Sequence, residues 1–266
     1  MRCSGIIEKL NELSDPRYAE EWDNVGLLVG DPENEINKVY IAVDATDEVV
    51  DAAVNSGADM LITHHPLIFR GIKKVTSDDF IGRRIMKIIK NDICYFAMHT
   101  NFDVMGMADE AADMIGISKS TVLQITYEDE ISHEGFGRVG DMSVPMNLND
   151  MCEFIKSRFN LEGVKVYGNT GNIIRRAAIM PGSGHSSVNG VSTIDAALTN
   201  GADVLITGDI DHHDGIDAVA KGLDIIDAGH FGIEKIFIPY MKEYIERNIP
   251  DVAVDFDTEE EPFRII

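Results

Sequence analysis

A stretch of thirteen residues occurs twice in this chain, and it constrains the fold more than any other feature of the sequence. Residues 51–63 read DAAVNSGADMLIT and residues 195–207 read DAALTNGADVLIT. Self-similarity of this length across half the chain is typical of a duplicated unit. The first copy continues into HHP and the second into GD, so the copies diverge directly after the repeat. This divergence indicates where one half has acquired ligand chemistry.

Apolar periodicity around the two copies predicts the same alternation of strands and helices in each half. The first half is expected to contain strands at 39–43, 60–63 and 93–98, with helices at 47–55 and 80–90. The second half is expected to contain strands at 177–180, 204–207 and 224–226, with helices at 193–199 and 215–221. This alternation implies mostly parallel sheets with helices on both faces. We therefore expect an α/β fold of two interlinked, topologically related domains, 1–125 and 126–266, that arose by internal duplication.

The rest of the sequence is less regular. It predicts helices over 6–13 and 148–158, a short strand after Gly26 and a strand over 164–167. Between the halves, residues 128–134 are turn-prone and residues 135–140 are rich in glycine.

Composition excludes several classes of function. The 23 basic and 46 acidic residues give a formal net charge of -23, which repels nucleic acids and anionic membrane surfaces. The three cysteines form no C-x-x-C pair, so neither a disulfide framework nor a thiolate zinc site is expected. No apolar run has the length of a membrane span, and no signal-peptide pattern opens the chain. We expect a cytoplasmic protein without a membrane partner.

Candidate metal ligands gather at the carboxyl ends of the predicted strands, where α/β folds place their binding sites. When the halves are aligned outward from the repeat, His99 corresponds to His230, and four residues later Asp103 corresponds to Glu234. Four-residue spacing places each histidine and its carboxylate on one side of a helical turn. Imidazole with carboxylate suits zinc, iron, manganese or nickel, so the pattern predicts a metal site.

The first half adds His64 and His65 directly after its copy of the repeat. Neighbouring side chains of an extended segment point to opposite sides, and Pro66 favours an extended backbone at His65. The two histidines can therefore reach different ions, which predicts two neighbouring divalent metal ions. A lone histidine at a strand end is more often a hydrogen-bonded polar residue, so the metal interpretation depends on the combination.

A second cluster of potential donors follows the second copy of the repeat. Its members are Asp209, Asp211, His212 and His213. They can line the same cleft, or they can form a solvated helix start at which aspartate caps the backbone. The sequence favours neither interpretation.

Six motifs, in their order along the chain, resemble those of the NIF-three-like family, often catalogued as GTP cyclohydrolase 1 type 2 homologues. They are EWDNVGL at 21–27, THHP at 63–66, HTNFD at 99–103, GFGRVG at 135–140, TGD at 207–209 with histidines at 212 and 213, and GH at 229–230 followed by Glu234. The resemblance covers nearly the whole chain. It departs from those members that carry a long extra domain between the halves, for which this chain has no room.

The resemblance implies a toroidal homohexamer of α/β subunits with dinuclear metal sites that face an internal cavity. The metal ligands that it implies are His64, His65, Asp103, His230 and Glu234. His99 also matches the family pattern, and we expect it to be a conditional or outer-shell ligand. The candidates for a catalytic role are His99, Asp209 and His213.

Paired divalent ions lower the pKa of a bound water and polarise a substrate group, so the predicted activity is hydrolysis of a nucleotide or related small molecule. Only the resemblance supplies the more specific reaction, the opening of the imidazole ring of GTP. No G-x-x-x-x-G-K-[ST] loop is present, so a nucleotide is not expected to be held in P-loop fashion. The alternative is a non-catalytic metal-binding or regulatory assembly.

Three further features each have a structural and a functional interpretation. Trp22, the only tryptophan, is expected in the core, with stacking on a substrate as the alternative. Cys94 and Cys152 fall in apolar patterns and are expected to be inert core thiols. Residues 181–186, PGSGHS, are expected to form an ordinary turn, with an anion-binding nest as the alternative.

Overall fold

The computed structural model describes residues 1–258 and 260–263, which form two compact units. Unit 1 comprises Met1–Phe102 and Phe237–Glu260, and unit 2 comprises Asp103–Ile236 and the chain from Glu261.

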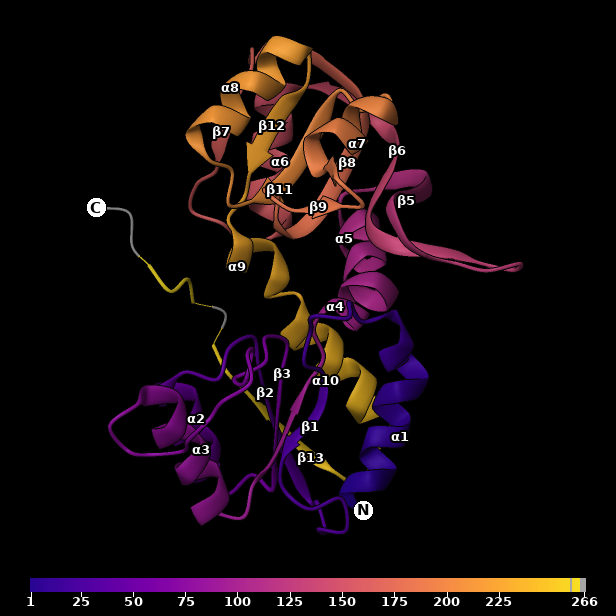
Figure 1. Cartoon of the computed structure of the whole chain (residues 1–266). Helices are drawn as coiled ribbons and strands as arrows, with labels where there is room; N and C mark the ends of the chain where they lie inside the picture. The colour runs from indigo at the N-terminus through magenta and orange to yellow at the C-terminus, as the bar shows by residue number, and fades with distance from the viewer. Residues whose placement is uncertain (259, 264–266) are drawn as a thin grey trace. The chain divides into compact units, whose positions relative to one another are not determined.

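These units differ from the expected division into 1–125 and 126–266. The chain passes from unit 1 to unit 2 between Phe102 and Asp103, and residues 237–260 return to unit 1. The return has a structural cause, because this last segment supplies one helix and one edge strand to unit 1 (Figure 1).

A five-stranded sheet in the order β1-β4-β3-β2-β13 forms the centre of unit 1. Its strands are β1 (Gly26–Val29), β2 (Lys38–Ala42), β3 (Met60–Thr63), β4 (Cys94–Ala97) and β13 (Ala253–Phe256). The strands from β4 to β13 run parallel, and β1 is antiparallel to β4. The carboxyl ends of β3 and β4 therefore lie side by side at one edge of the sheet.

Helices cover both faces of this sheet (Figure 1). On one face, α2 (Asp47–Ser56) and α3 (Phe80–Lys90) pack on apolar residues of β2, β3 and β4. On the other face lie α1 (Cys3–Leu13) and α10 (Phe237–Asn248). The short turns are a 3-10 helix at Pro16–Tyr18 and α4 at Thr100–Phe102. Among the described residues, no helix combines the length and the apolar character needed to cross a bilayer.

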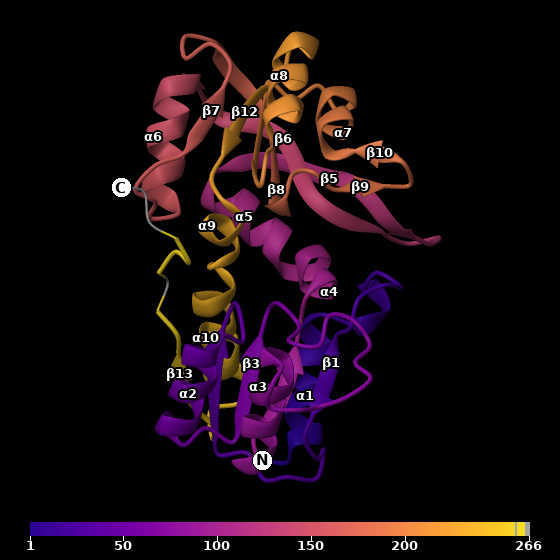
Figure 2. The same cartoon turned by 60° about the vertical axis from the view of Figure 1, so that its left-hand side comes forward.

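Unit 2 has a six-stranded sheet in the order β5-β6-β8-β11-β12-β7 (Figure 2). Its strands are β5 (Ile117–Glu128), β6 (His133–Asn147), β7 (Lys165–Tyr167), β8 (Ile173–Ser183), β11 (Val204–Gly208) and β12 (Asp224–Asp227). A small hairpin adds β9 (Ser187–Val188) and β10 (Val191–Ser192). The helices are a π-helical turn at Asp103–Met107, α5 (Ala108–Met114), α6 (Leu148–Arg158), α7 (Thr193–Thr199), α8 (His212–Lys221) and α9 (His230–Glu234).

The expectation of mostly parallel sheets holds for unit 1 and fits unit 2 less well. In unit 2, β8, β11 and β12 run parallel, whereas β5, β6 and β7 join the sheet antiparallel. The long hairpin β5–β6 was expected only as a turn and a glycine-rich stretch. A Cβ at Gly135 would lie 2.0 Å from the carbonyl oxygen of Gln124, so glycine is what lets these strands approach.

Four strands of each sheet share one topology. The orders β1-β4-β3-β2 in unit 1 and β7-β12-β11-β8 in unit 2 have the same relative strand directions. The repeated segments occupy equivalent places, from α2 into β3 and from α7 into β11. The expected topological relation between the two α/β parts is therefore confirmed, and their origin by duplication stays a prediction.

Candidate metal centre

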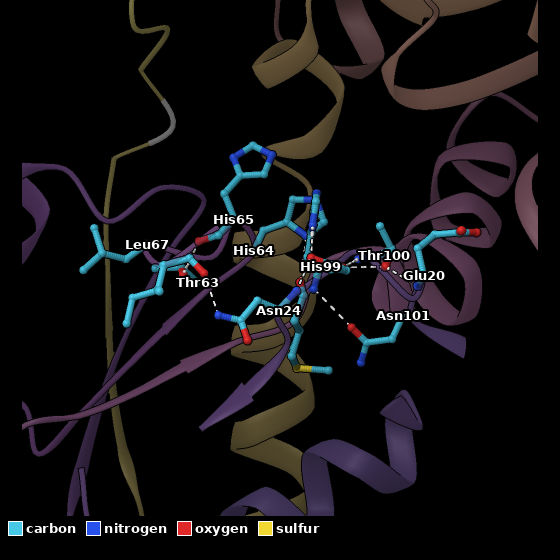
Figure 3. A network of polar contacts seen from close by, with 12 residues as sticks. Glu20, Asn24, Thr63, His64, His65, Leu67, His99, Thr100 and Asn101 are labelled. Atoms are coloured by element: carbon cyan, nitrogen blue, oxygen red, sulfur yellow. Dashed lines mark hydrogen bonds and ion pairs between the residues drawn. The ribbon is translucent and has the colours of Figure 1, made fainter. Parts of the chain in front are cut away.

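The carboxyl ends of β3 and β4 bring three histidines of unit 1 together (Figure 3). His64 and His65 follow the last residue of β3, and His99 lies shortly beyond β4. The ring centroids lie 4.8 Å apart for His64 and His65, 5.3 Å for His64 and His99, and 5.5 Å for His65 and His99. One ring nitrogen of each lies within 4.8 Å of the other two, a spacing from which they could hold a metal ion. His99, expected as a conditional ligand, thus belongs to the same cluster.

Each of these imidazoles is oriented by a hydrogen bond at Nδ1. The acceptors are Met98 O for His64 at 2.8 Å, Asp44 Oδ1 for His65 at 2.8 Å and Asp23 Oδ1 for His99 at 2.9 Å. Because carbonyl and carboxylate oxygens only accept, each Nδ1 carries the proton and donates it. The remaining nitrogen, Nε2, becomes the atom that can bind a metal, which is the usual arrangement around histidine ligands.

The carboxylate of Asp23 lies buried behind His99. It also accepts hydrogen bonds from Thr100, from the backbone nitrogen at 3.0 Å and from Oγ1 at 2.5 Å. Burial alone would raise the pKa of Asp23, but the hydrogen bonds from His99 and Thr100 lower this pKa to about 2. Asp23 therefore keeps its negative charge at neutral pH and holds His99 in one orientation.

Tyr95 of β4 holds the backbone at His65. Its hydroxyl accepts a hydrogen bond from the backbone nitrogen of Leu67 at 2.7 Å and lies 2.7 Å from Thr63 Oγ1. Both hydroxyl oxygens lie within 3.0 Å of the carbonyl oxygen of His65. Burial raises the pKa of Tyr95 to about 12, so the hydroxyl stays protonated. The His-His-Pro turn is thereby fixed to the neighbouring strand.

In unit 2, α9 places His230 and Glu234 one turn apart on the same side of the helix. Nε2 of His230 lies 3.0 Å from Oε2 of Glu234, and its Nδ1 lies 2.7 Å from Oδ2 of Asp209. Asp209 follows β11 with a φ of 54°, in the left-handed region. An oxygen of Asp103 lies within 4.8 Å of an oxygen of Glu234. Unit 2 therefore gathers three of the expected ligands.

Strand β8 passes close to these donors at Gly182. Its φ of +79° is left-handed, and a Cβ there would lie 2.6 Å from Oε1 of Glu234. The same Cβ would lie 3.8 Å from Nε2 of His230. Both the backbone conformation and the space therefore require glycine at this position.

The structure places Asp211 and His213 at the start of α8. The carboxylate of Asp211 accepts hydrogen bonds at 2.9 Å from the backbone nitrogens of His213 and Asp214. The capping interpretation of Asp211 is therefore confirmed. His213 is exposed, with its ring 5.2 Å from that of His212, and belongs to none of the donor groups among the described residues.

His185 of the PGSGHS segment forms a further group of potential metal donors with Asp211 and Asp214. Nδ1 of His185 lies 2.6 Å from Oδ2 of Asp214 and 3.9 Å from Oδ2 of Asp211. The hydrogen bond to Asp214 raises the pKa of His185. Carboxylates at this loop repel anions, which counts against an anion-binding nest here.

Sequence reasoning missed two of the carboxylates that orient the histidines, Asp23 and Asp44. Asp23 precedes His99 by 76 residues, and its one signal is its place in the EWDNVGL motif. Asp44 follows β2, which neighbours β3, so the register of adjacent strand ends could have pointed to it.

Among the residues with two interpretations, Trp22 departs from its expected place. Its side chain is 57% exposed, so the expectation of a core tryptophan is wrong. The carboxylate of the next residue, Asp23, is buried in its place, behind His99. Cys94 and Cys152 are buried free thiols, as expected.

Comparison with known proteins shows the family to which this chain belongs. The sequence model of the family described as Duf34/NIF3 (NGG1p interacting factor 3) matches residues 1–262. A Clostridium perfringens protein named GTP cyclohydrolase 1 type 2 homolog is 33% identical over 271 residues, with 100% of both chains covered. A Clostridium acetobutylicum protein of the same name is 34% identical over 94% of this chain and 90% of its own. The crystal structure of Staphylococcus aureus hypothetical protein SA1388 superposes with a TM-score of 0.87 at 29% identity, covering 100% of this chain and 99% of that one. The chain therefore belongs to the Duf34/NIF3 family.

Proposed function

We propose that this protein binds divalent metal ions, two per chain. The proposed ligands are His64, His65, Asp103, His230 and Glu234. The observation that carries the proposal is the orientation of the ligand imidazoles: in His64, His65 and His230, Nδ1 meets a carbonyl or carboxylate oxygen. Such partners fix the ring orientation and increase the basicity of metal-binding histidines.

The types of donor atom in the proposed site limit which metal ions it favours. Imidazole nitrogens mixed with carboxylate oxygens suit zinc, iron, manganese or nickel better than magnesium or calcium, which prefer oxygen donors alone. Within unit 2, Glu234 is buried beside the imidazole of His230. A buried carboxylate is stabilised by a bound cation, which supports a metal ion at this position.

We further propose hydrolysis of a nucleotide or related small molecule as the activity. When bound, two such ions supply Lewis acidity that activates water and polarises the group under attack. Of the catalytic candidates, His99 is the one that the structure favours for proton transfer, because Asp23 fixes its protonated nitrogen and leaves Nε2 for the substrate side. Asp209 orients His230, and we assign no catalytic role to His213. The nucleotide is suggested by the names of the relatives, GTP cyclohydrolase 1 type 2 homolog.

We also propose that the protein forms a toroidal homohexamer, as the resemblance implies, and that it acts in the cytoplasm. Light scattering coupled to gel filtration measures the mass of the particle directly. A monomer at micromolar concentration would contradict the hexamer.

The metal proposal is tested by the metal content of purified protein, measured by mass spectrometry after loading and dialysis. We expect up to two ions in the wild type and their loss in the double variant His65→Ala/Glu234→Ala. His213→Ala is the matched control, because it removes an exposed histidine outside the donor groups. Full metal retention in the double variant would refute the ligand assignment.

The enzymatic proposal is tested by a hydrolysis screen over nucleotides and small amides with the metal-loaded protein. We expect turnover that the same double variant abolishes. Turnover unaffected by the double variant would locate the activity elsewhere. Metal binding without turnover on any substrate would favour the non-catalytic, regulatory alternative.

A further inference from the structure

Two exposed aromatic side chains stand beside the histidine cluster of unit 1. Trp22 is 57% exposed and Phe69 is 44% exposed. Their ring centroids lie 5.7 Å apart with planes inclined by 57°. Both rings also approach His99, Trp22 at 6.0 Å and Phe69 at 6.2 Å. We call this pair, Trp22 and Phe69, the aromatic platform.

The platform is held in place by the polar groups around it. The side chain of Asn24 donates a hydrogen bond of 2.5 Å to the carbonyl oxygen of Ile68, which joins the two segments that carry the rings. Asp23, directly after Trp22, is fixed by His99 and Thr100. These hydrogen bonds order the backbone that carries the two rings before a ligand binds. Stacking of a ligand on the platform therefore costs little conformational entropy of the protein.

The chemistry of the platform indicates a planar ring as its occupant. Aromatic side chains offer flat π faces, and nucleobases stack on them with little dependence on base identity. The segment that follows Phe69 carries Arg70, Lys73 and Lys74, all exposed, within a chain whose net charge is -23. A planar ring that carries an anionic group complements both features.

We propose that Trp22 and Phe69 bind the planar heteroaromatic ring of an anionic ligand, such as the base of a mononucleotide, next to His99. The ligand class rests on the proposed function, which it makes more specific. In this arrangement the ring lies on the platform while the group to be attacked reaches His99 and the neighbouring imidazoles. Trp22 and Phe69 are then residues that position the ligand and determine its specificity.

The chain offers a direct reporter, because Trp22 is its only tryptophan. Stacking of a base on this ring quenches its fluorescence. A titration of the protein with nucleotide, followed by tryptophan fluorescence, therefore reports binding at the platform itself. We expect guanosine monophosphate and adenosine monophosphate to quench saturably, and ribose 5-phosphate, which lacks the ring, to leave the fluorescence unchanged. Ribose 5-phosphate that binds as tightly as the nucleotides by calorimetry would overturn the proposal.

Variants separate stacking from other contributions. Phe69→Ala and Trp22→Ala should each weaken nucleotide binding by about five- to one-hundredfold in calorimetry, the range that stacking on one aromatic side chain contributes. Trp22→Phe should retain most of the affinity. Phe80→Ala is the matched control, since Phe80 is a 52% exposed phenylalanine outside the platform. Unchanged affinity in both alanine variants, with folding verified by circular dichroism, would refute the platform.

The same titration in the double variant His65→Ala/Glu234→Ala distinguishes the two proposals. Quenching that persists there, even if the wild type shows no metal and no turnover, supports the platform independently of the metal centre. A tryptophan signal that changes with protein concentration and not with nucleotide would identify a second copy of the chain as the occupant, and would overturn the ligand assignment.

Discussion

Asp23 and His99 are joined by a hydrogen bond of 2.9 Å from Nδ1 to Oδ1, although 76 residues separate them in the sequence. The bond makes Nδ1 the protonated nitrogen of His99 and links the EWDNVGL segment to the end of β4. One buried carboxylate thereby fixes the tautomer of a histidine in the candidate centre and the backbone beside the exposed Trp22.

Replacing Asp23 with asparagine tests this relationship. The amide is neutral and cannot match the charge-assisted bonds from His99 and Thr100, so we expect a loss of about 1.5–3 kcal/mol in the free energy of unfolding. Nitrogen chemical shifts of His99 should change from one tautomer, protonated at Nδ1, to a mixture. Glu21→Gln, an exposed neighbouring carboxylate, should change neither measurement. An unaltered tautomer in Asp23→Asn would contradict the orienting role.

Gly182 tests the packing of β8 against Glu234. In Gly182→Ala the methyl group meets Oε1 of Glu234 and the backbone keeps an unfavourable positive φ. Gly190 is a matched control, because its φ is +78° and nothing lies within 4 Å of its Cβ position. We expect Gly190→Ala to lower the unfolding free energy by about 1 kcal/mol and Gly182→Ala by about 2–4 kcal/mol.

Gly182→Ala should also lose metal, while Gly190→Ala keeps it. Denaturant titration and metal analysis of the same preparations supply both comparisons. Equal destabilisation in the two variants would mean that the backbone conformation, and not contact with Glu234, is what requires glycine at 182.

Local pattern made much of this fold predictable. The strand ending at Thr63 and the helices 80–90, 148–158 and 193–199 occur with the predicted bounds. The apolar periodicity lies within each segment, and the capping residue of each helix directly precedes it. The position of His64, His65 and His230 directly after or close to predicted strand ends then identified them as candidate metal ligands. These inferences need only residues that are near one another in sequence.

Pairing between segments that are far apart in the sequence could not be predicted from local patterns. The pairing of β13 with β2 joins segments more than two hundred residues apart. No local sequence pattern therefore predicts that the chain returns to unit 1. The hairpin β5–β6 contains glycines at close backbone contacts, which lower the apparent strand tendency of its sequence. Asp44 and Asp23 likewise act through the fold and carry no spacing signal toward the histidines that they orient.

Tyr95→Phe tests the support of the His-His-Pro turn. The change removes one oxygen that meets Leu67 N, Thr63 Oγ1 and His65 O, and it leaves a buried backbone nitrogen without its acceptor. We expect a loss of about 1–3 kcal/mol in unfolding free energy. Tyr127→Phe, which removes an exposed hydroxyl that bonds to Asp129, should have little effect. Comparable losses in both variants would contradict a special role for Tyr95.

The pair of His185 and Asp214 predicts a pH dependence that nuclear magnetic resonance can follow. Because the hydrogen bond to the Asp214 carboxylate stabilises the imidazolium, the pKa of His185 should lie above its ordinary value in the folded protein. A raised pKa means that the pair stabilises the fold fully below the unfolded pKa of histidine, and that this contribution disappears as the pH rises through the folded pKa. Titration of the His185 ring protons in chelator-treated buffer measures the shift.

Asp214→Asn should return the pKa of His185 toward the ordinary value. Asp217→Asn, which removes an exposed charge from the same helix, should leave most of the shift in place. The comparison decides between a specific hydrogen bond and the general field of a strongly acidic protein, since both variants remove one negative charge from α8. Equal decreases in the two variants would assign the raised pKa to the overall charge, and a large decrease in Asp214→Asn alone would assign it to the hydrogen bond.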